Sequence, residues 1–293
     1  MSRALQDDAT FEAERSRLVG LAYRITGSRA EADDIVQDAW LRWQRVDPST
    51  VERPAAWLTT VTSRLSLDRL KSARSQRETY VGPWLPEPAD REPGPADHAE
   101  LAESLTIGFL ALLERLGPAE RVVFLLADVF SVPFDEIALV VDKSPEACRQ
   151  TASRARRRVR DERPRYTPTD EDAWRVTTAF LGAAQAGDLD TLVSLLADDA
   201  LAISDGGPHQ HAARRPIVAE RIPRFIANLS RRALEPDDVV VPRLVNGQPG
   251  MVIERDGAPI LALALSVHNG QVHRLWAIVN KEKLATLNAP PIT

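Results

Sequence analysis

The sequence predicts two all-α domains followed by one α+β domain. Three observations support this division. Apolar residues recur at helical spacing across about residues 11–77, and a second helical stretch covers about residues 101–163. Strand-like segments separated by Asn-Gly and Asp-Gly dipeptides begin near residue 200. The length of 293 residues suggests about two domains at roughly 100–200 residues each, and Pro-rich segments divide the chain further.

Composition and charge place the chain among soluble globular proteins, with 44% hydrophobic and 27% charged residues. No apolar run is long enough to span a bilayer and no signal segment opens the chain, so we expect a cytoplasmic protein with no membrane partner. The single cysteine, Cys148, excludes an intramolecular disulfide and a thiolate zinc cluster. A net charge of −5 would be unusual for a DNA-binding protein of uniform charge, but here positive charge is concentrated locally.

Three helices are predicted within residues 11–77. The first breaks at Gly27-Ser28, the second ends before Pro48, and the third begins at Pro54. Acidic residues in the first turn of the second helix favour its dipole. The third helix becomes basic toward its end, with Arg64, Arg69, Lys71, Arg74 and Arg77.

Prolines and glycines dominate the stretch that follows, YVGPWLPEPADREPGPAD, so we expect a linker without regular structure. Apolar residues such as Trp84 are unusual in a linker and suggest a contact. A second, shorter linker follows the second helical stretch. The predicted boundaries are residues 1–80 and 101–163 for the two helical domains, 81–100 and 164–172 for the linkers, and 173–293 for the α+β domain.

The segment from Asp135 to Arg160 is predicted to form a short helix, a tight turn at Asp142-Lys143 and a second helix. Ser144 can cap the second helix, and a proline follows in its first turn. That helix has no acid after Glu146 and carries Arg149, Arg154, Arg156, Arg157, Arg158 and Arg160. Two helices joined by a brief turn, the second cationic, indicate a helix-turn-helix that places its second helix in a DNA major groove.

Base edges are reached from the start of such a recognition helix, where Ser144, Glu146, Arg149 and Gln150 lie. Arg149 suits guanine and Gln150 suits adenine. Contacts to phosphates, which fix position without reading sequence, are assigned to Arg154, Arg157 and Arg158.

The last third of the chain changes character. Two helices are expected at about Ala173–Gly182 and Asp188–Leu196. The strand-like segments that follow are Ala200–Ile203, Asp238–Leu244, Gly250–Glu254, Ile260–His268 and Gln271–Ile278. Asn-Gly and Asp-Gly dipeptides between them are hairpin-turn signals. This pattern predicts helices that precede a mostly antiparallel curved sheet.

Two separated motifs, in order, resemble one known family. The segment RLVGLAYRITGSRAEADDIVQDAWLRW, Arg17–Trp43, resembles region 2 of bacterial extracytoplasmic-function sigma factors, and the helix-turn-helix resembles their region 4. YVGPWLPEP, SDGG at Ser204–Gly207 and NGQPG at Asn246–Gly250 resemble the subgroup with a fused C-terminal SnoaL-like domain. The resemblance implies two all-α sigma domains followed by an α+β cone of the NTF2-like fold.

The chain departs from the family pattern at two places. The helix-turn-helix turn often carries glycine in this family, whereas here it is Asp142-Lys143. Aspartate tolerates left-handed backbone geometry better than most residues, so this change is mild. A second motif of the subgroup usually has lysine between glycine and proline, but this chain has DGAP at residues 256–259.

The resemblance implies a sigma factor that binds core RNA polymerase and directs promoter recognition and transcription initiation. By resemblance, the second helix binds the polymerase through Asp34, Gln37, Asp38 and Arg42, and the basic third helix contacts the −10 region. The fused C-terminal domain would tune this activity. Its implied contact points with the sigma domains are Trp84, Asn246, Gly247, Gln248, Pro249 and Gly250.

A cone of this fold has a pocket, for which the candidates are Asp205, His209, His268, His273 and Trp276. An aspartate with a histidine can do general acid–base work. Reaction-specific motifs are absent, so we expect no enzyme, no cofactor and no metal, while a small-molecule ligand in the cone remains an option. Two alternatives stay open: a ligand-sensing helix-turn-helix regulator that binds an operator without polymerase, and a SnoaL-like enzyme with a DNA-binding arm.

Overall fold

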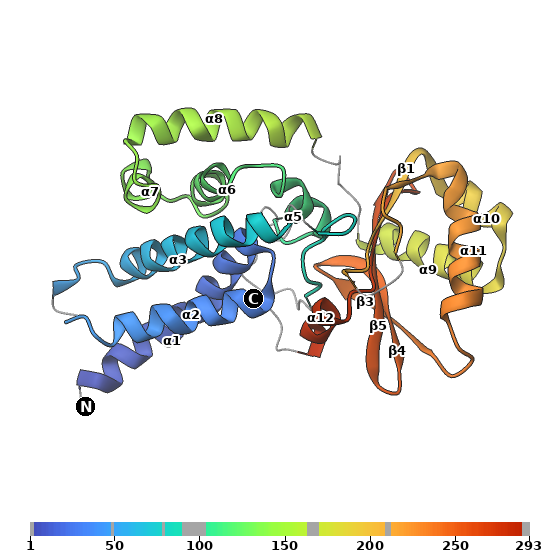
Figure 1. Ribbon diagram of the computed structural model, residues 1–293, viewed down its shortest axis with the longest axis horizontal. Helices are drawn as coiled ribbons and strands as arrows, with labels where there is room; N and C mark the ends of the chain where they lie inside the picture. The colour runs from blue at the N-terminus through green and yellow to red at the C-terminus, as the bar shows by residue number, and fades with distance from the viewer. Residues whose placement is uncertain are drawn as a thin grey trace.

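The computed structural model describes residues 3–47, 50–77, 80–89, 104–162, 170–208 and 212–288 (Figure 1). Helices form one half of the molecule, and a sheet flanked by helices forms the other. The observed order of elements confirms the predicted fold class, in which two helical domains precede an α+β domain. No helix among the described residues is both long and apolar enough to cross a membrane.

The first helical domain contains α1 (Arg3–Thr26), α2 (Arg29–Trp43) and α3 (Pro54–Arg77), which pack against one another. Gly27, with φ at +72°, ends α1. Ser28 then caps α2 by accepting a hydrogen bond from the Glu31 amide. The predicted break and the predicted start of the second helix are therefore confirmed. Phe11 packs against Trp40, and Trp43 against Trp57, so the tryptophans hold these helices in their own domain.

The second helical domain comprises α5 (Ile107–Leu113), α6 (Pro118–Phe124), η2 (Leu125–Val129), α7 (Phe134–Val141) and α8 (Pro145–Glu162). The predicted helix-turn-helix is α7 and α8. Asp142 adopts a left-handed φ of 53° at the turn, as its side chain permits. Ser144 Oγ accepts a hydrogen bond from the Ala147 amide at 3.2 Å, so the predicted cap is present.

Both helical domains share one continuous hydrophobic cluster. Helix α3 contacts α6 and α7, and α7 packs on α8 (Figure 1). The buried Arg121 of α6 donates from Nε and Nη2 to the carbonyl oxygen of Arg24, at 3.2 and 3.0 Å. That carbonyl lies in the last turn of α1, where helix carbonyls lack partners within the helix. A charged side chain of the second domain therefore satisfies the end of a helix in the first.

The C-terminal domain begins with α9 (Asp170–Ala186) and α10 (Leu189–Leu195). It continues with β1 (Leu196–Asp205), β2 (Ile217–Val218), η3 (Ala219–Arg221), α11 (Ile222–Ala233), β3 (Val239–Val245), β4 (Gln248–Arg255), β5 (Ala258–His268), β6 (Gln271–Ile278), α12 (Lys281–Leu284) and η4 (Ala285–Asn288). The strand order is β2-β1-β6-β5-β4-β3, and only the β1–β6 pair is parallel.

The three hairpins of this sheet turn at Asn246-Gly247, Asp256-Gly257 and Asn269-Gly270, with positive φ at both residues of each turn. This is the geometry that Asn-Gly and Asp-Gly favour, so these predicted turns are confirmed. Strand β1 begins four residues earlier than predicted, directly after α10. The sequence prediction left out β2, α11 and α12.

The two faces of the sheet are covered differently. Leu261, Leu263 and Leu265 face the helices α9, α10 and α11 in one cluster. On the opposite face, Ala262, Ala264, Trp276 and Ile278 pack with Leu85, Ile107 and Leu284. The alternation follows from the period of two along a strand. Because Leu85 and Ile107 belong to the helical half of the chain, this second sheet face forms the interface between the domains.

Residues 80–89 run along this interface, and we call them the strap. They form no helix or strand, yet Leu85 is only 1% exposed and Ala89 only 6% exposed. Helices α5 and α12 lie beside the same boundary between the helical half and the sheet (Figure 1). The remainder of the predicted linker, residues 90–100, and most of the second linker lie outside the described residues.

Candidate nucleic-acid interface and interdomain contacts

Helix α8 presents one apolar and one polar face. Cys148, Ala152, Ala155 and Val159 are buried toward the domain core. The four residues predicted to reach base edges, Ser144, Glu146, Arg149 and Gln150, are exposed. Glu146 accepts from Arg149 Nη1 at 3.2 Å and from Gln150 Nε2 at 3.5 Å. These weak exposed contacts leave both side chains able to turn toward a ligand.

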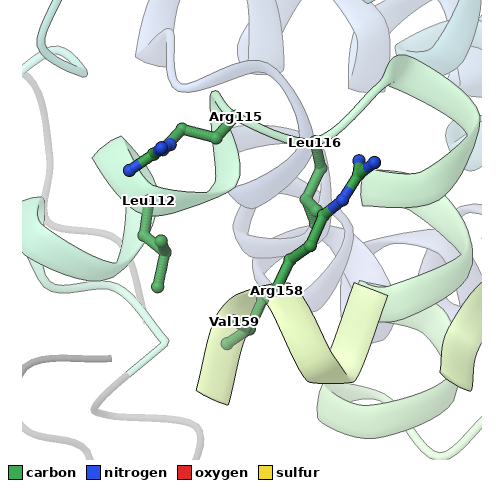
Figure 2. Close-up of a pocket in the computed structure, with 5 residues that line it drawn as sticks. All are labelled: Leu112, Arg115, Leu116, Arg158 and Val159. Atoms are coloured by element: carbon green, nitrogen blue, oxygen red, sulfur yellow. The ribbon is translucent and has the colours of Figure 1, made fainter. Parts of the chain in front are cut away.

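The arginines predicted to contact phosphates differ in their surroundings. Arg154 donates to the Thr151 hydroxyl at 3.3 Å, while Arg157 is exposed. Arg158 forms an ion pair with Glu120 of α6 at 2.8 Å. Arg158 also borders a cavity of about 320 Å³ between α5 and α8, together with Leu112, Arg115, Leu116 and Val159 (Figure 2).

One of the basic residues of α3, Arg64, contacts the second helical domain. Arg64 donates from Nε and Nη2 to the Leu139 carbonyl of α7, at 3.0 and 2.5 Å. Arg53, just before α3, pairs with Glu136 of α7 at 2.5 Å. Arg69 is exposed, and Lys71 lies 3.7 Å from Asp68. The side chains of Arg74 and Arg77 lie outside the described residues.

The residues of α2 assigned to polymerase, Asp34, Gln37, Asp38 and Arg42, are all exposed and fall at helical spacing. Leu41, on the same side of the helix, is 43% exposed. The opposite side, with Ala32, Ile35 and Ala39, is buried in the domain core. An exposed stripe of mixed polar and apolar character suits a protein partner better than solvent alone.

Asn246 contacts three parts of the chain at once. Its side-chain Oδ1 accepts from the Ala89 amide at 2.9 Å. Its Nδ2 donates to the Tyr23 hydroxyl of α1 at 2.6 Å and to the Leu105 carbonyl, two residues before α5, at 2.9 Å. The residue is 1% exposed. Burial raises the pKa of the Tyr23 phenol well above its usual range, so the hydroxyl group stays neutral. It donates a hydrogen bond to the Glu87 carbonyl.

The rest of the NGQPG segment supports the same interface. Gln248 Oε1 accepts from the Ile107 amide, the first residue of α5, at 3.0 Å. Gly250 lies so close to its neighbour strand that a Cβ there would be 1.9 Å from the Leu263 carbonyl oxygen. Pro249 is buried, and Gly247 holds the hairpin turn. Asn246 and Gln248 thus lie where the C-terminal domain meets both helical domains, and the residues around them shape the hairpin that presents these two side chains.

Asp205 is fully buried against the strap and does not line the interior of the cone. Its Oδ2 pairs with Lys283 Nζ at 2.7 Å and accepts from the Leu85 amide at 2.8 Å. Its Oδ1 accepts from the Tyr80 hydroxyl at 2.5 Å. Burial, and then the hydrogen bond to Asp205, raise the pKa of the Tyr80 phenol. The Trp84 ring packs 4.0 Å from Lys283 Nζ, in a cation–π contact.

The other pocket candidates are not gathered around Asp205. Trp276 is buried against Gly108 of α5, where an added Cβ would be 2.7 Å from the indole. The rings of His268 and His273 lie 5.8 Å apart at a tilt of 57° near the turn between β5 and β6, whereas Asp205 pairs with Ile278 at the other end of β6. His209 lies outside the described residues. No cluster of three or more metal-ligating side chains occurs among the residues that the structure describes.

Sequence reasoning missed three residues of this interface, Tyr23, Glu87 and Lys283, and it also missed the buried Arg121, which joins the two helical domains. Tyr23 lies inside the motif that carries the region 2 resemblance, but nothing local distinguishes it from a core tyrosine. Glu87 lies between two prolines in a segment expected to be a linker. A carboxylate within such an apolar stretch is the one signal that points to a specific partner.

Comparisons with known proteins agree with the sequence resemblance. The Sigma-70 region 2 family matches residues 10–76, and the Sigma-70 region 4 family matches residues 108–159. The chain is 42% identical over 290 residues to the ECF RNA polymerase sigma factor SigJ of Mycobacterium tuberculosis, covering 93% of this chain and 91% of that one. It is 34% identical over 284 residues to the probable ECF sigma factor SigI of the same species, covering 96% of each.

The solved structures include a relative that spans the whole arrangement. The crystal structure of Mycobacterium tuberculosis SigJ superposes with a TM-score of 0.76 at 39% identity. The match covers 96% of this chain and 99% of that chain. It includes the helical domains and the C-terminal domain together.

Proposed function

The chain belongs to the extracytoplasmic-function RNA polymerase sigma factors, and from this premise we propose how its surfaces divide the work of promoter recognition. As a sigma factor it is a binding protein and not an enzyme. It binds core RNA polymerase and directs transcription initiation at its promoters, and we place this activity in the cytoplasm.

Helix α2 contacts the polymerase through Asp34, Gln37, Asp38 and Arg42. Its exposed polar stripe and Leu41 support this assignment. The basic end of α3 follows the opened strand near the −10 region, where cations neutralise phosphates. Helix α8 enters the major groove of the −35 element, with Arg149 and Gln150 toward base edges.

The docked arrangement of the two helical domains keeps the two DNA-binding helices too close together for this task. Helix α7 packs on both α3 and α8, and packed helix axes lie about 8–10 Å apart, so α3 and α8 are at most about 20 Å apart where they flank α7. The −10 and −35 elements are about 25 base pairs apart, or about 85 Å at 3.4 Å per base pair. The helical domains must therefore separate before both elements are bound.

The C-terminal domain holds this docked arrangement, because Asn246 and Gln248 contact the first helical domain, the strap and the start of α5. Promoter engagement is accordingly disfavoured while the domain is docked. A small-molecule ligand would bind inside the cone, among α9, α10 and α11. Asp205 and Trp276 face away from that interior, which argues against assigning them to such a ligand or to catalysis.

Transcription in vitro with core RNA polymerase and a matched promoter tests this function. We expect transcripts only when the chain is added, and fewer with Arg149→Ala. Arg175→Ala, which removes an exposed arginine of α9, is the matched control and should leave transcription unchanged. If the chain neither binds core polymerase nor starts transcription where a control sigma factor does, the proposal fails. Sequence-specific duplex binding without polymerase would then favour the operator-binding alternative.

A further inference from the structure

The N-terminal turn of α2 obtains its hydrogen-bond acceptors from a distant part of the chain. Glu87 of the strap accepts from the Arg29 amide through Oε2 at 2.6 Å, and from the Ala30 amide at 3.3 Å. Its Oε1 accepts from the hydroxyl of the capping residue Ser28 at 2.8 Å. The first amides of a helix have no partner within the helix, and an anion there also meets the positive end of the dipole. Glu87 therefore completes a cap that Ser28 alone provides only in part.

The strap backbone is fixed at the same place. The Glu87 amide donates to the Gly27 carbonyl at 2.9 Å, and the Glu87 carbonyl accepts from the Tyr23 hydroxyl at 2.6 Å. These contacts join the strap to the corner between α1 and α2. The position of the Glu87 carboxylate at the helix end is thus set by the backbone as well as by the side chain.

The C-terminal domain holds the strap on both sides of Glu87. Before it, Asp205 accepts from the Leu85 amide, and Lys283 donates to the Leu85 carbonyl. After it, the Ala89 amide donates to Asn246 Oδ1, and the Ala89 carbonyl accepts from the Asn246 amide at 2.9 Å. A single proline separates Glu87 from each anchor, too little chain for its carboxylate to remain on α2 if the C-terminal domain moves away.

We propose that Glu87 is a positioning residue that couples docking of the C-terminal domain to the order of the polymerase-binding helix α2. With the domain docked, Glu87 caps α2 and its first turn is ordered. When the domain moves away, the strap and its carboxylate move with it. The amides in the first turn of α2 then donate their hydrogen bonds to water. This inference rests on the proposed role of α2, and it adds a physical route by which the C-terminal domain reaches the polymerase-binding surface.

Hydrogen exchange of the Arg29 and Ala30 amides in the full-length protein tests the coupling without polymerase. Glu87→Gln removes the negative charge at nearly constant shape and should speed their exchange by about twofold to thirtyfold, the range expected for loss of a helix cap. Asn246→Gly does not touch either amide, yet it should also speed their exchange. Glu52→Gln, the same change at an exposed site beyond α2, is the matched control and should have no effect.

Affinity for core polymerase gives the second readout. Glu87→Gln and Asn246→Gly should each weaken binding, and the double variant should bind no more weakly than the more affected single variant. Glu87→Asp keeps the carboxylate on a shorter side chain, so its affinity should fall between those of the wild type and Glu87→Gln. This variant also replaces Glu87→Gln if the latter does not fold.

Two results would overturn the coupling. In the first, Asn246→Gly speeds exchange of the Ile107 amide, which reports undocking, but leaves Arg29 and Ala30 unchanged. In the second, the effects of the two substitutions on polymerase affinity multiply, as for independent sites. If the wild-type protein itself does not bind polymerase, the proposed function fails, while the exchange experiment still decides the coupling.

Discussion

Replacing Asn246 with glycine removes the side chain that joins the C-terminal domain to the strap and to both helical domains. Glycine is the suitable replacement because Asn246 has a φ of 53°, which alanine adopts only with strain. The backbone hydrogen bond from residue 246 to the Ala89 carbonyl can persist. The substitution therefore tests the three side-chain hydrogen bonds with little disturbance of the hairpin.

The magnitude follows from the partners left behind. The Ala89 amide and the Leu105 carbonyl both belong to buried residues and would lose this partner, whereas the Tyr23 hydroxyl keeps its bond to the Glu87 carbonyl. Each buried polar group without a partner costs about 1–3 kcal/mol, so docking weakens by about 2–6 kcal/mol. Water entering the interface reduces this cost, so we expect the lower end, about 2–3 kcal/mol. That is about a 30- to 150-fold increase in the undocked population.

Exchange of the Ile107 amide, which donates to Gln248 across the interface, measures this population. Its rate should rise by the same factor, while amides inside α8 keep their rates. Asn269→Gly is the matched control, because Asn269 has the same turn geometry at an exposed hairpin far from the helical domains. A change of less than threefold in a folded Asn246→Gly protein would refute the assignment of this residue to docking. An equal change in Asn269→Gly would refute it as well.

Four further outcomes follow from single side chains. Arg149→Ala should cost about 1–3 kcal/mol of the free energy of promoter binding and relax sequence preference. Arg157→Ala should weaken binding to all sequences alike and lower by about one the slope of log affinity against log salt concentration. Salt titrations of DNA binding measure both effects. The hydrogen bond from Arg255 lowers the pKa of Asp238 to about 2. The free energy of unfolding lost in Asp238→Asn, measured by urea unfolding, should therefore be constant above about pH 5 and should decline as pH falls through about 2. Burial raises the pKa of the Cys148 thiol, so a disulfide reagent should modify it slowly in the native protein and quickly in urea.

The helix-turn-helix could be predicted from the sequence because its determinants are local. Asp142 permits the left-handed turn, Ser144 caps the next helix, and Pro145 fits only a first turn. The hairpin turns were predictable for the same reason. Each of these features depends on a few adjacent residues, whatever the rest of the chain does.

The strap could not be predicted, because its structure depends on residues far away in the chain. Its prolines correctly exclude helix and strand, but they do not reveal that Leu85 is buried between two domains. Asp205 shows the same limit. In the sequence it is the polar residue of the SDGG motif, and its carboxylate suggests a place in the pocket of the cone. In the structure its partners are the backbone of Leu85 and the side chain of Lys283.

The strap is attached more strongly to the C-terminal domain than to the first helical domain. On the C-terminal side, the Leu85 amide donates to Asp205 and the Leu85 carbonyl accepts from Lys283, and hydrogen bonds to charged groups are typically worth about 1.5–3 kcal/mol each. On the other side, Glu87 contributes a helix cap, typically worth about 0.5–2 kcal/mol, and its backbone has hydrogen bonds with Gly27 and Tyr23 at about 1 kcal/mol each. When the domains part, the weaker attachment breaks first, so the strap leaves with the C-terminal domain and takes Glu87 from α2. The order in which these contacts break therefore makes the first turn of α2 sensitive to docking of the C-terminal domain.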